Sequence, residues 1–185
     1  EILETAVALF AERGYAGTTI ALIASRIGIT DAGVLYHVPS KQTLFVEALE
    51  TFGAEQLEQI MRLAEPGGLT AIEQLGAWGS LMEQRPDLLA LQIVLDAEGV
   101  LPTSELHGYW TVRHCALISL VEGLFTQAIE RGEIDPATDA SAEARSFVAH
   151  LDGARLQWFS SEGEASIAMS VERYVGLLVD RIRRA

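Results

Sequence analysis

Apolar residues recur at intervals of three and four along almost the whole chain, and no convincing run alternates apolar and polar residues. Intervals of three and four are typical of helices, and strict alternation is typical of strands. Glycine, proline and capping residues divide the pattern into segments. We therefore predict an all-α protein of about nine helices, which with their capping residues cover 2–13, 18–28, 30–38, 40–64, 70–84, 86–99, 105–131, 141–160 and 165–184.

The second and third predicted helices are short and closely spaced. The second begins at the Thr18–Thr19 pair and ends at Gly28, and Thr30 caps the third. The second helix has one apolar stripe, at Ile20, Ile23, Ala24 and Ile27. Val34 and Val38 of the third helix can face this stripe. Two short helices joined by a tight turn are typical of a helix-turn-helix, whose second helix lies in the major groove of DNA.

Length and composition favour a globular protein with a sizeable core. The chain has 185 residues, 49% of them hydrophobic, and no stretch that reads as a membrane span. The single cysteine, Cys115, excludes an internal disulfide, and no charged-then-apolar leader precedes the first helix. We expect a cytoplasmic protein with a DNA-binding domain at residues 1–45 and a larger helical domain at residues 46–185.

The net charge of −13 is unusual for a protein that binds nucleic acid, but it is unevenly distributed. Residues 1–45 hold three basic and four acidic side chains, whereas residues 46–185 hold ten basic and 22 acidic ones. A negative body repels phosphate, so DNA affinity must come from a small set of contacts and should fall steeply with salt.

The N-terminal third resembles the tetracycline-repressor (TetR) family of transcriptional regulators. The residues that carry the resemblance keep the family's order and spacing without a gap, and they are Ala6, Leu9, Phe10, Gly14, Tyr15, Thr18, Thr19, Ile20, Ile23, Ala24, Gly28, Ile29, Thr30, His37, Ser40, Lys41 and Leu44. The resemblance implies an N-terminal three-helix bundle and a C-terminal helical domain for ligand binding and dimerisation. It also implies a homodimer that binds a palindromic operator in double-stranded DNA, most often as a repressor, and that a small-molecule effector releases.

The third predicted helix departs from the family pattern. Ala32-Gly33-Val34-Leu35 stands where the family usually has Gly-Thr-Leu-Tyr, so Leu35 cannot supply the phosphate-directed hydroxyl often found there. A glycine inside a helix costs roughly 1 kcal/mol relative to alanine. Gly33 therefore indicates a close approach of the backbone to DNA, a helix that stiffens on binding, or simple drift.

We assign a contact role to seven residues of the predicted DNA-binding surface, which are Thr19, Thr30, Asp31, Gly33, Tyr36, His37 and Lys41. Thr19 and Lys41 begin helices, where side chains and free amides can bind phosphate. Asp31 can accept from a cytosine amino group, and the Tyr36 ring can meet a thymine methyl group. Two alternatives stay open: Asp31 as a first-turn charge favoured by the helix dipole, and His37 as a phosphate contact that reads no sequence.

One short recognition helix cannot bind an operator alone, so two must act together, about 34 to 36 Å apart or at another spacing that the DNA permits. The predicted dimer interface consists of apolar stripes on the last two helices, at Phe147, Leu151, Ala154, Trp158, Val171, Tyr174, Val175, Leu178 and Ile182. Such stripes equally describe an ordinary core.

The middle helices carry bulky side chains with a few polar ones among them, which is typical of a pocket for a small, largely apolar molecule. The predicted lining consists of Trp78, Met82, Leu91, Gln92, Leu95, Trp110, His114, Ile118 and Phe125. Ordinary core packing is the alternative. A ligand at this position would swing the fourth predicted helix and so change the separation of the two recognition helices.

Other functional classes find less support in the sequence. No phosphate loop, nucleophile elbow or metalloprotease motif is present, so we predict no enzyme, no catalytic residue and no cofactor. His107 and His114 lie seven apart, but with Glu105 or Glu122 they make a poor metal site, and we predict none. Cys115 is expected to be buried and inert, and the alternative is a redox sensor if it is exposed. The strongest rival is a helical ligand-binding or interaction module whose specific DNA binding is weakened or lost.

Overall fold

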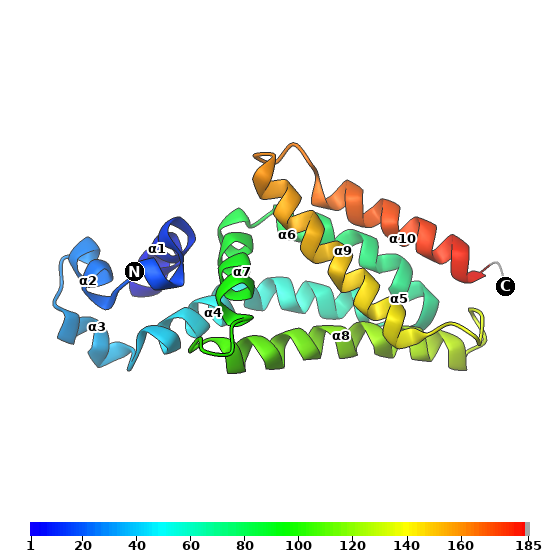
Figure 1. The fold of residues 1–185 in the computed structure, drawn as a ribbon, viewed down its shortest axis with the longest axis horizontal. Coiled ribbons are helices and arrows are strands. Elements are labelled where there is room, and N and C mark those ends of the chain that lie inside the picture. Colours follow the sequence, from blue (N-terminus) through cyan, green and yellow to red (C-terminus); the bar gives the residue numbers. More distant parts are fainter. Residues whose placement is uncertain (184–185) are drawn as a thin grey trace. The chain divides into compact units, whose positions relative to one another are not determined.

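The computed structural model describes residues 1–183, apart from the side chain of Glu55, and every regular element in this range is a helix. The elements are α1 (Ile2–Gly17), α2 (Ile20–Ile27), α3 (Asp31–His37), α4 (Lys41–Ala64), α5 (Gly68–Gln74), the 3₁₀ helix η1 (Leu75–Ala77), α6 (Trp78–Glu83), α7 (Pro86–Gly99), α8 (His107–Glu130), α9 (Ala140–Ser160) and α10 (Ile167–Arg183) (Figure 1). The all-α prediction is confirmed. None of the described helices combines the length and the apolar character needed to cross a bilayer.

The prediction of one helix over residues 70–84 is wrong, because α5, η1 and α6 divide this segment. Two glycines there lie against the backbone of α10. A Cβ atom at Gly79 would come within 2.6 Å of the Cα atom of Ala168, and one at Gly76 within 3.4 Å of that of Glu172. This close approach accompanies the irregular segment. The predicted end of the last helix, Arg184, lies outside the described residues.

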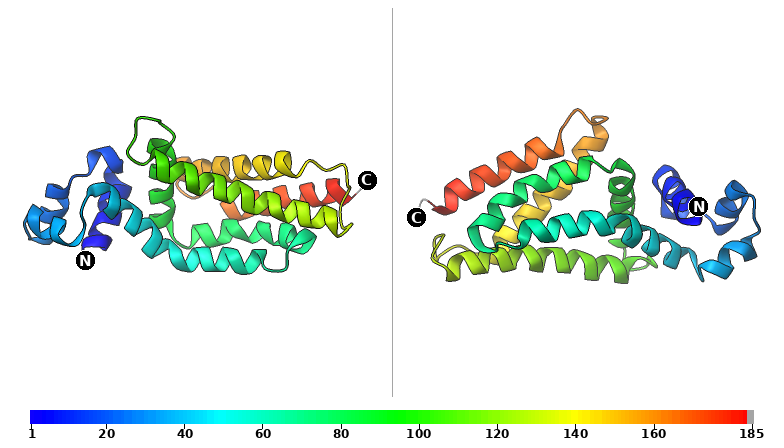
Figure 2. Two further views of the ribbon diagram at one scale, coloured as in Figure 1. Left: turned by 90° about the horizontal axis from the view of Figure 1, so that it is seen from below. Right: turned by 180° about the vertical axis from the view of Figure 1, so that it is seen from behind.

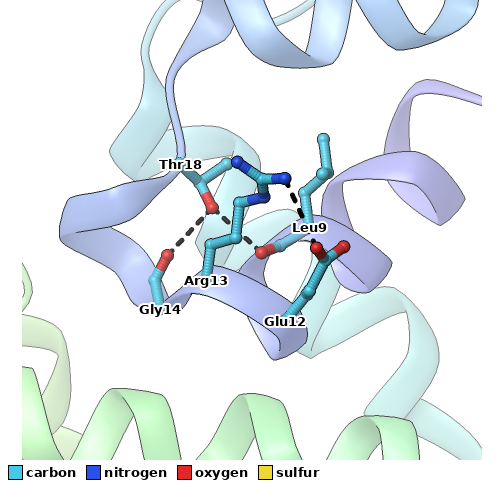
Figure 3. Close-up of polar contacts among 5 residues, drawn as sticks. All are labelled: Leu9, Glu12, Arg13, Gly14 and Thr18. Atoms are coloured by element: carbon cyan, nitrogen blue, oxygen red, sulfur yellow. Dashed lines mark hydrogen bonds and ion pairs between the residues drawn. The ribbon is translucent and has the colours of Figure 1, made fainter.

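The end of α1 contains a kink that the sequence predicts as a helix stop. Gly14 has a φ of 71°, a left-handed conformation that glycine adopts without steric cost. The buried side chain of Thr18 follows, with its hydroxyl oxygen 3.0 Å from the carbonyl oxygen of Leu9 and 2.9 Å from that of Gly14 (Figure 3). One hydroxyl proton therefore serves two backbone acceptors, and the chain turns towards α2.

The chain forms two compact units. Unit 1 comprises residues 1–55 and 85–111, and unit 2 comprises residues 56–84 and 112–185. This division by packing differs from the predicted boundary at residue 45, because α7 packs against α1 and so joins the N-terminal helices. Each of α4 and α8 is one continuous helix (Figure 2), and each contributes residues to both units.

Aromatic clusters mark the core of each unit. In unit 1, the rings of Phe10 and Tyr15 stack at 5.8 Å, and the ring of Phe45 meets both edge-on at 4.9 and 5.3 Å. In unit 2, the ring of Trp78 meets that of Phe147 edge-on at 5.6 Å. Edge-on and offset contacts of this kind add to the stabilisation that burial provides. The core of unit 1 therefore fixes the small helices that precede α4.

Candidate nucleic-acid interface

The sequence-encoded caps place α2 and α3 as a helix-turn-helix. The Thr19 hydroxyl accepts a hydrogen bond of 3.1 Å from the backbone N–H of Leu22, and Gly28 ends α2 in a left-handed conformation with a φ of 78°. The Thr30 hydroxyl accepts in the same way from the N–H of Gly33. Each hydroxyl keeps its own proton, so both remain able to donate to a phosphate.

The buried and the exposed side chains of α2 and α3 lie on opposite faces of the helices, as the sequence pattern predicts. Ile23, Ala24 and Val34 are buried, whereas Asp31, Tyr36 and His37 are exposed, and 86% of the Tyr36 surface is accessible. The rings of Tyr36 and His37 meet edge-on at 5.2 Å. Both rings are therefore accessible to a partner on this side of α3. The exposed face of α3 is therefore the candidate base-reading surface.

Gly33 does not owe its presence to a left-handed backbone or to severe crowding. A Cβ atom there would lie 3.4 Å from side-chain atoms of Ile29 and Thr30, which is an ordinary contact distance. The φ angle of Gly33 is not positive. The helix would accommodate alanine at this position. The backbone-approach explanation of Gly33 therefore stays a prediction about the complex with DNA.

Lys41, a predicted phosphate contact, is held by the end of α1. Its ammonium nitrogen donates to the carbonyl oxygen of Tyr15 at 3.0 Å and lies 4.0 Å from the centroid of the Tyr15 ring. Beside it, the Ser40 hydroxyl accepts from the N–H of Thr43 at 3.0 Å, so Ser40 caps α4 as predicted. An ammonium group has three N–H donors, which leaves donors for a phosphate oxygen.

The residues that hold Lys41 in place give no signal in the sequence. The Tyr15 hydroxyl donates to Glu105 Oε2 at 2.7 Å, and the backbone N–H of Ala16 donates to Glu98 Oε1 at 3.0 Å. Burial, then the bond to Glu105, raises the pKa of Tyr15 above its ordinary value. Glu105 is 90 residues from Tyr15, and Glu98 is 82 residues from Ala16, so no local pattern predicts these bonds.

The predicted ligand-pocket residues belong to different compact units. Unit 2 holds Trp78, Met82, His114, Ile118 and Phe125, and unit 1 holds Leu91, Gln92, Leu95 and Trp110. Leu91 and Leu95 are fully buried in the apolar cluster that α7 forms with α1. These two residues contribute to the core of unit 1. The lining role of the predicted set stays a prediction.

The predicted dimer stripes on α9 and α10 face inward. Most of their side chains are buried within the single chain, namely Phe147, Leu151, Ala154, Val171, Val175, Leu178 and Ile182, and Trp158 and Tyr174 are half-buried. The seven buried side chains are therefore core residues, because α9 and α10 pack against each other and α10 also covers η1 and α6. An interface role for Trp158 and Tyr174 stays a prediction.

Two further expectations concern reactive side chains. Cys115 is exposed on α8, which corrects the expectation that it is buried. His107 Nδ1 lies 2.8 Å from the carbonyl oxygen of Gly99, so this ring bonds the end of α7. Within residues 1–183, no three His, Cys, Asp or Glu side chains are grouped so as to hold a metal ion.

The sequence of the chain is similar to those of known DNA-binding regulators. The family model described as bacterial regulatory proteins, tetR family, matches residues 2–48. The chain is 26% identical to the HTH-type transcriptional regulator TtgR of Pseudomonas putida over 99% of this chain and 90% of that protein. It is 24% identical to the HTH-type transcriptional repressor KstR2 of Rhodococcus jostii over 97% and 88% of the two chains.

A solved structure shows the same fold along the chain. The transcriptional regulator FadR from Bacillus subtilis, in complex with stearoyl-CoA, superposes with a TM-score of 0.79 at 19% identity and covers 96% of each chain. The family match falls on α1 to α3 and the start of α4, where the caps and the exposed face of α3 form the helix-turn-helix. Residues 2–48 therefore form a DNA-binding domain of the tetR family of bacterial regulatory proteins, and along its length the chain is similar to transcriptional regulators.

Proposed function

We propose that this regulator is a cytoplasmic repressor that binds a palindromic operator as a homodimer and leaves it when a largely apolar effector binds. The observation that carries the DNA-binding role is α3, which is capped by Thr30, anchored by the buried Val34 and exposed at Asp31, Tyr36 and His37. A helix of this size reaches only a few base pairs, so two copies are needed for an operator.

The proposed dimer surface is the outward face of α9 and α10. Ala149, Gly153 and Leu156 share one face of α9, and Leu156 is 58% exposed. Gly176 and Leu177 share the outward face of α10, with Leu177 63% exposed, and Cβ atoms at both glycines would meet open space. Small residues beside exposed leucines suit close helix packing. A second copy of the chain is the proposed occupant, since a two-fold axis would pair the same faces.

The proposed effector site lies in unit 2 around Trp78. Its indole nitrogen Nε1 is buried and has no hydrogen-bond partner within the described part of the chain. Leaving such a donor unsatisfied costs about 1 to 3 kcal/mol. A mostly apolar effector that carries one hydrogen-bond acceptor would remove this cost. FadR and its stearoyl-CoA complex provide a fold-level precedent for ligand binding, not the identity of this effector.

The proposed response works through a difference in affinity. An effector changes DNA binding only if it favours one arrangement of the protein over another, and a typical coupling of about 1 to 3 kcal/mol gives a several-fold to hundredfold effect. The helix α4 runs without interruption from Lys41 to Ala64 and supplies residues to both units. It is therefore a candidate element for carrying the change.

Selection from a random duplex pool tests the function. The purified chain should enrich a palindromic sequence, and Tyr36→Ala should abolish the enrichment while Tyr109→Phe, a conservative change outside α3, leaves it intact. Without enrichment even at low salt, the rival class of a ligand-binding or interaction module would replace the repressor. A ligand that binds tightly but leaves operator affinity unchanged would reject the effector response.

A further inference from the structure

Three segments of unit 1 meet at Tyr15, and we call the group Tyr15, Lys41, Glu98 and Glu105 the Tyr15 junction. Tyr15 follows the kink in α1, Lys41 is the first residue of α4, and Glu98 and Glu105 lie in the last turn of α7 and in the α7–α8 connection. All four residues belong to the same compact unit. The junction therefore links the α7–α8 connection to the DNA-binding helices.

The order of contacts within the junction runs from carboxylate to ring to ammonium. Glu105 accepts from the Tyr15 hydroxyl at 2.7 Å, and Tyr15 then offers Lys41 both its carbonyl oxygen, at 3.0 Å, and its ring, at 4.0 Å from the centroid. Tyr15 is buried, so its ring and hydroxyl cannot turn to water without opening the core. Glu105 therefore fixes Tyr15, and Tyr15 in turn fixes Lys41.

Two additional bonds join the α7–α8 region to the same place. Glu98 Oε1 accepts from the backbone N–H of Ala16 at 3.0 Å, and the carbonyl oxygen of Glu105 accepts from Gln42 Nε2 at 2.6 Å. The end of α1 and the first turn of α4 are therefore both bonded to the α7–α8 region. Loss of the Glu105 side chain would therefore affect the position of Lys41 through Tyr15, without a movement of the whole of α4.

We propose that Glu105 is a positioning residue of the DNA-binding site, which holds Lys41 ready for a phosphate by fixing Tyr15. This inference rests on the proposed function, because it needs a DNA complex in which Lys41 contacts phosphate. A lysine side chain loses much rotamer freedom when it is fixed, and binding is tighter when that loss has already occurred in the free protein. The α7–α8 connection would then set DNA affinity through Glu105.

A double-mutant cycle on the full chain tests the proposal, with the palindromic duplex from the selection experiment as the probe. Glu105→Ala should weaken binding several-fold, as should Lys41→Ala, and the double variant should bind no more weakly than Lys41→Ala alone. Lys41→Ala should lower the slope of log affinity against log salt by about 1, and Glu105→Ala should lower it in the same direction.

Three further variants guard against a trivial loss of folding. Glu105→Gln keeps a side-chain acceptor for the Tyr15 hydroxyl and should restore most of the affinity, whereas Tyr15→Phe should resemble Glu105→Ala. Glu50→Ala removes an exposed carboxylate from α4 in the same unit and should leave the salt slope unchanged. Circular dichroism and thermal unfolding would identify any variant that does not fold.

The outcomes separate this inference from the function on which it rests. If the unaltered chain retains no duplex, the proposed function fails. If it retains the duplex but the losses from Glu105→Ala and Lys41→Ala add independently, only the positioning role of Glu105 is overturned. An unchanged salt slope in both Glu105→Ala and Tyr15→Phe would overturn it equally.

Discussion

The Thr30 hydroxyl accepts a hydrogen bond of 3.1 Å from the backbone N–H of Gly33, and this single contact begins the recognition helix. The first N–H groups of a helix have no partner within the helix, so the cap decides where α3 starts. It also fixes which residues of α3 point outward, since every later side chain follows from that starting point.

Removal of this cap should weaken both the fold of α3 and its binding to DNA. Thr30→Ala is expected to lower the free energy of unfolding by about 1 kcal/mol, because the Gly33 N–H loses its acceptor. Urea unfolding and duplex titration measure the two effects. Thr30→Ser keeps the oxygen and should stay close to the unaltered protein. Equal behaviour of the two variants would contradict the capping role.

Gly33→Ala should separate stability from binding. Alanine in place of a helical glycine is expected to raise the free energy of unfolding by up to about 1 kcal/mol, since a Cβ atom at this position meets neighbours at 3.4 Å. Operator affinity should nevertheless fall if the α3 backbone approaches DNA at Gly33. Gly123→Ala in α8, where a Cβ atom meets open space, is the matched control and should leave DNA affinity unchanged.

The outward faces of α9 and α10 should be required for the dimer. Leu156→Glu and Leu177→Glu are expected to shift the chain from dimer to monomer, because each places a charge in a surface that two copies would bury. Sedimentation velocity measures the change. Leu57→Glu introduces the same charge at another exposed leucine, on α4, and should leave the dimer intact. A dimer that survives both interface changes would move the interface elsewhere.

Trp78 should report on the effector through its indole N–H. In ¹⁵N-labelled protein, the Trp78 indole signal, assigned with Trp78→Phe, is expected to move downfield when a compound that releases the operator is added, because the buried donor gains an acceptor. The signal of Trp158, which is half-buried, serves as the internal control. Release of DNA with no change at Trp78 would place the effector elsewhere.

Stability at high pH should depend on Tyr15. Burial and the bond to Glu105 raise its pKa in the folded chain above the unfolded value of about 10. The folded state therefore favours the protonated phenol, and this stability is complete below the unfolded pKa and declines as the pH rises above it. Unfolding free energies measured from pH 8 to 11 should fall more steeply for the unaltered chain than for Tyr15→Phe. Parallel curves would contradict this assignment.

Local signals predicted the helix-turn-helix well. Thr19, Gly28 and Thr30 each act on backbone groups within four or five residues, so the residue type at one position is enough to end or begin a helix. The break within residues 70–84 was not predictable in this way. The close packing of Gly79 accompanies this break, and only the backbone of Ala168 on α10 explains why a glycine is needed at that position.

The stripes on α9 and α10 illustrate a different limit. Periodicity identified Phe147 and Val175 as apolar faces, but it cannot state whether a face is covered by the same chain or by a second one. The structure covers both residues within the chain. Leu156 and Leu177, which lie on the outward faces of these helices, give no signal in the sequence because single exposed leucines are common on protein surfaces.

The sequence by itself determined the helical class, the positions of the caps and the identity of the exposed face of α3, because these depend on interactions between residues a few positions apart. Only the tertiary structure decided that Tyr15 joins Lys41 to Glu105, that Leu91 and Leu95 belong to the core of the DNA-binding unit, and that Cys115 is exposed. These features depend on which distant segments pack together, and the periodicity of one helix carries no information about the partner that covers it.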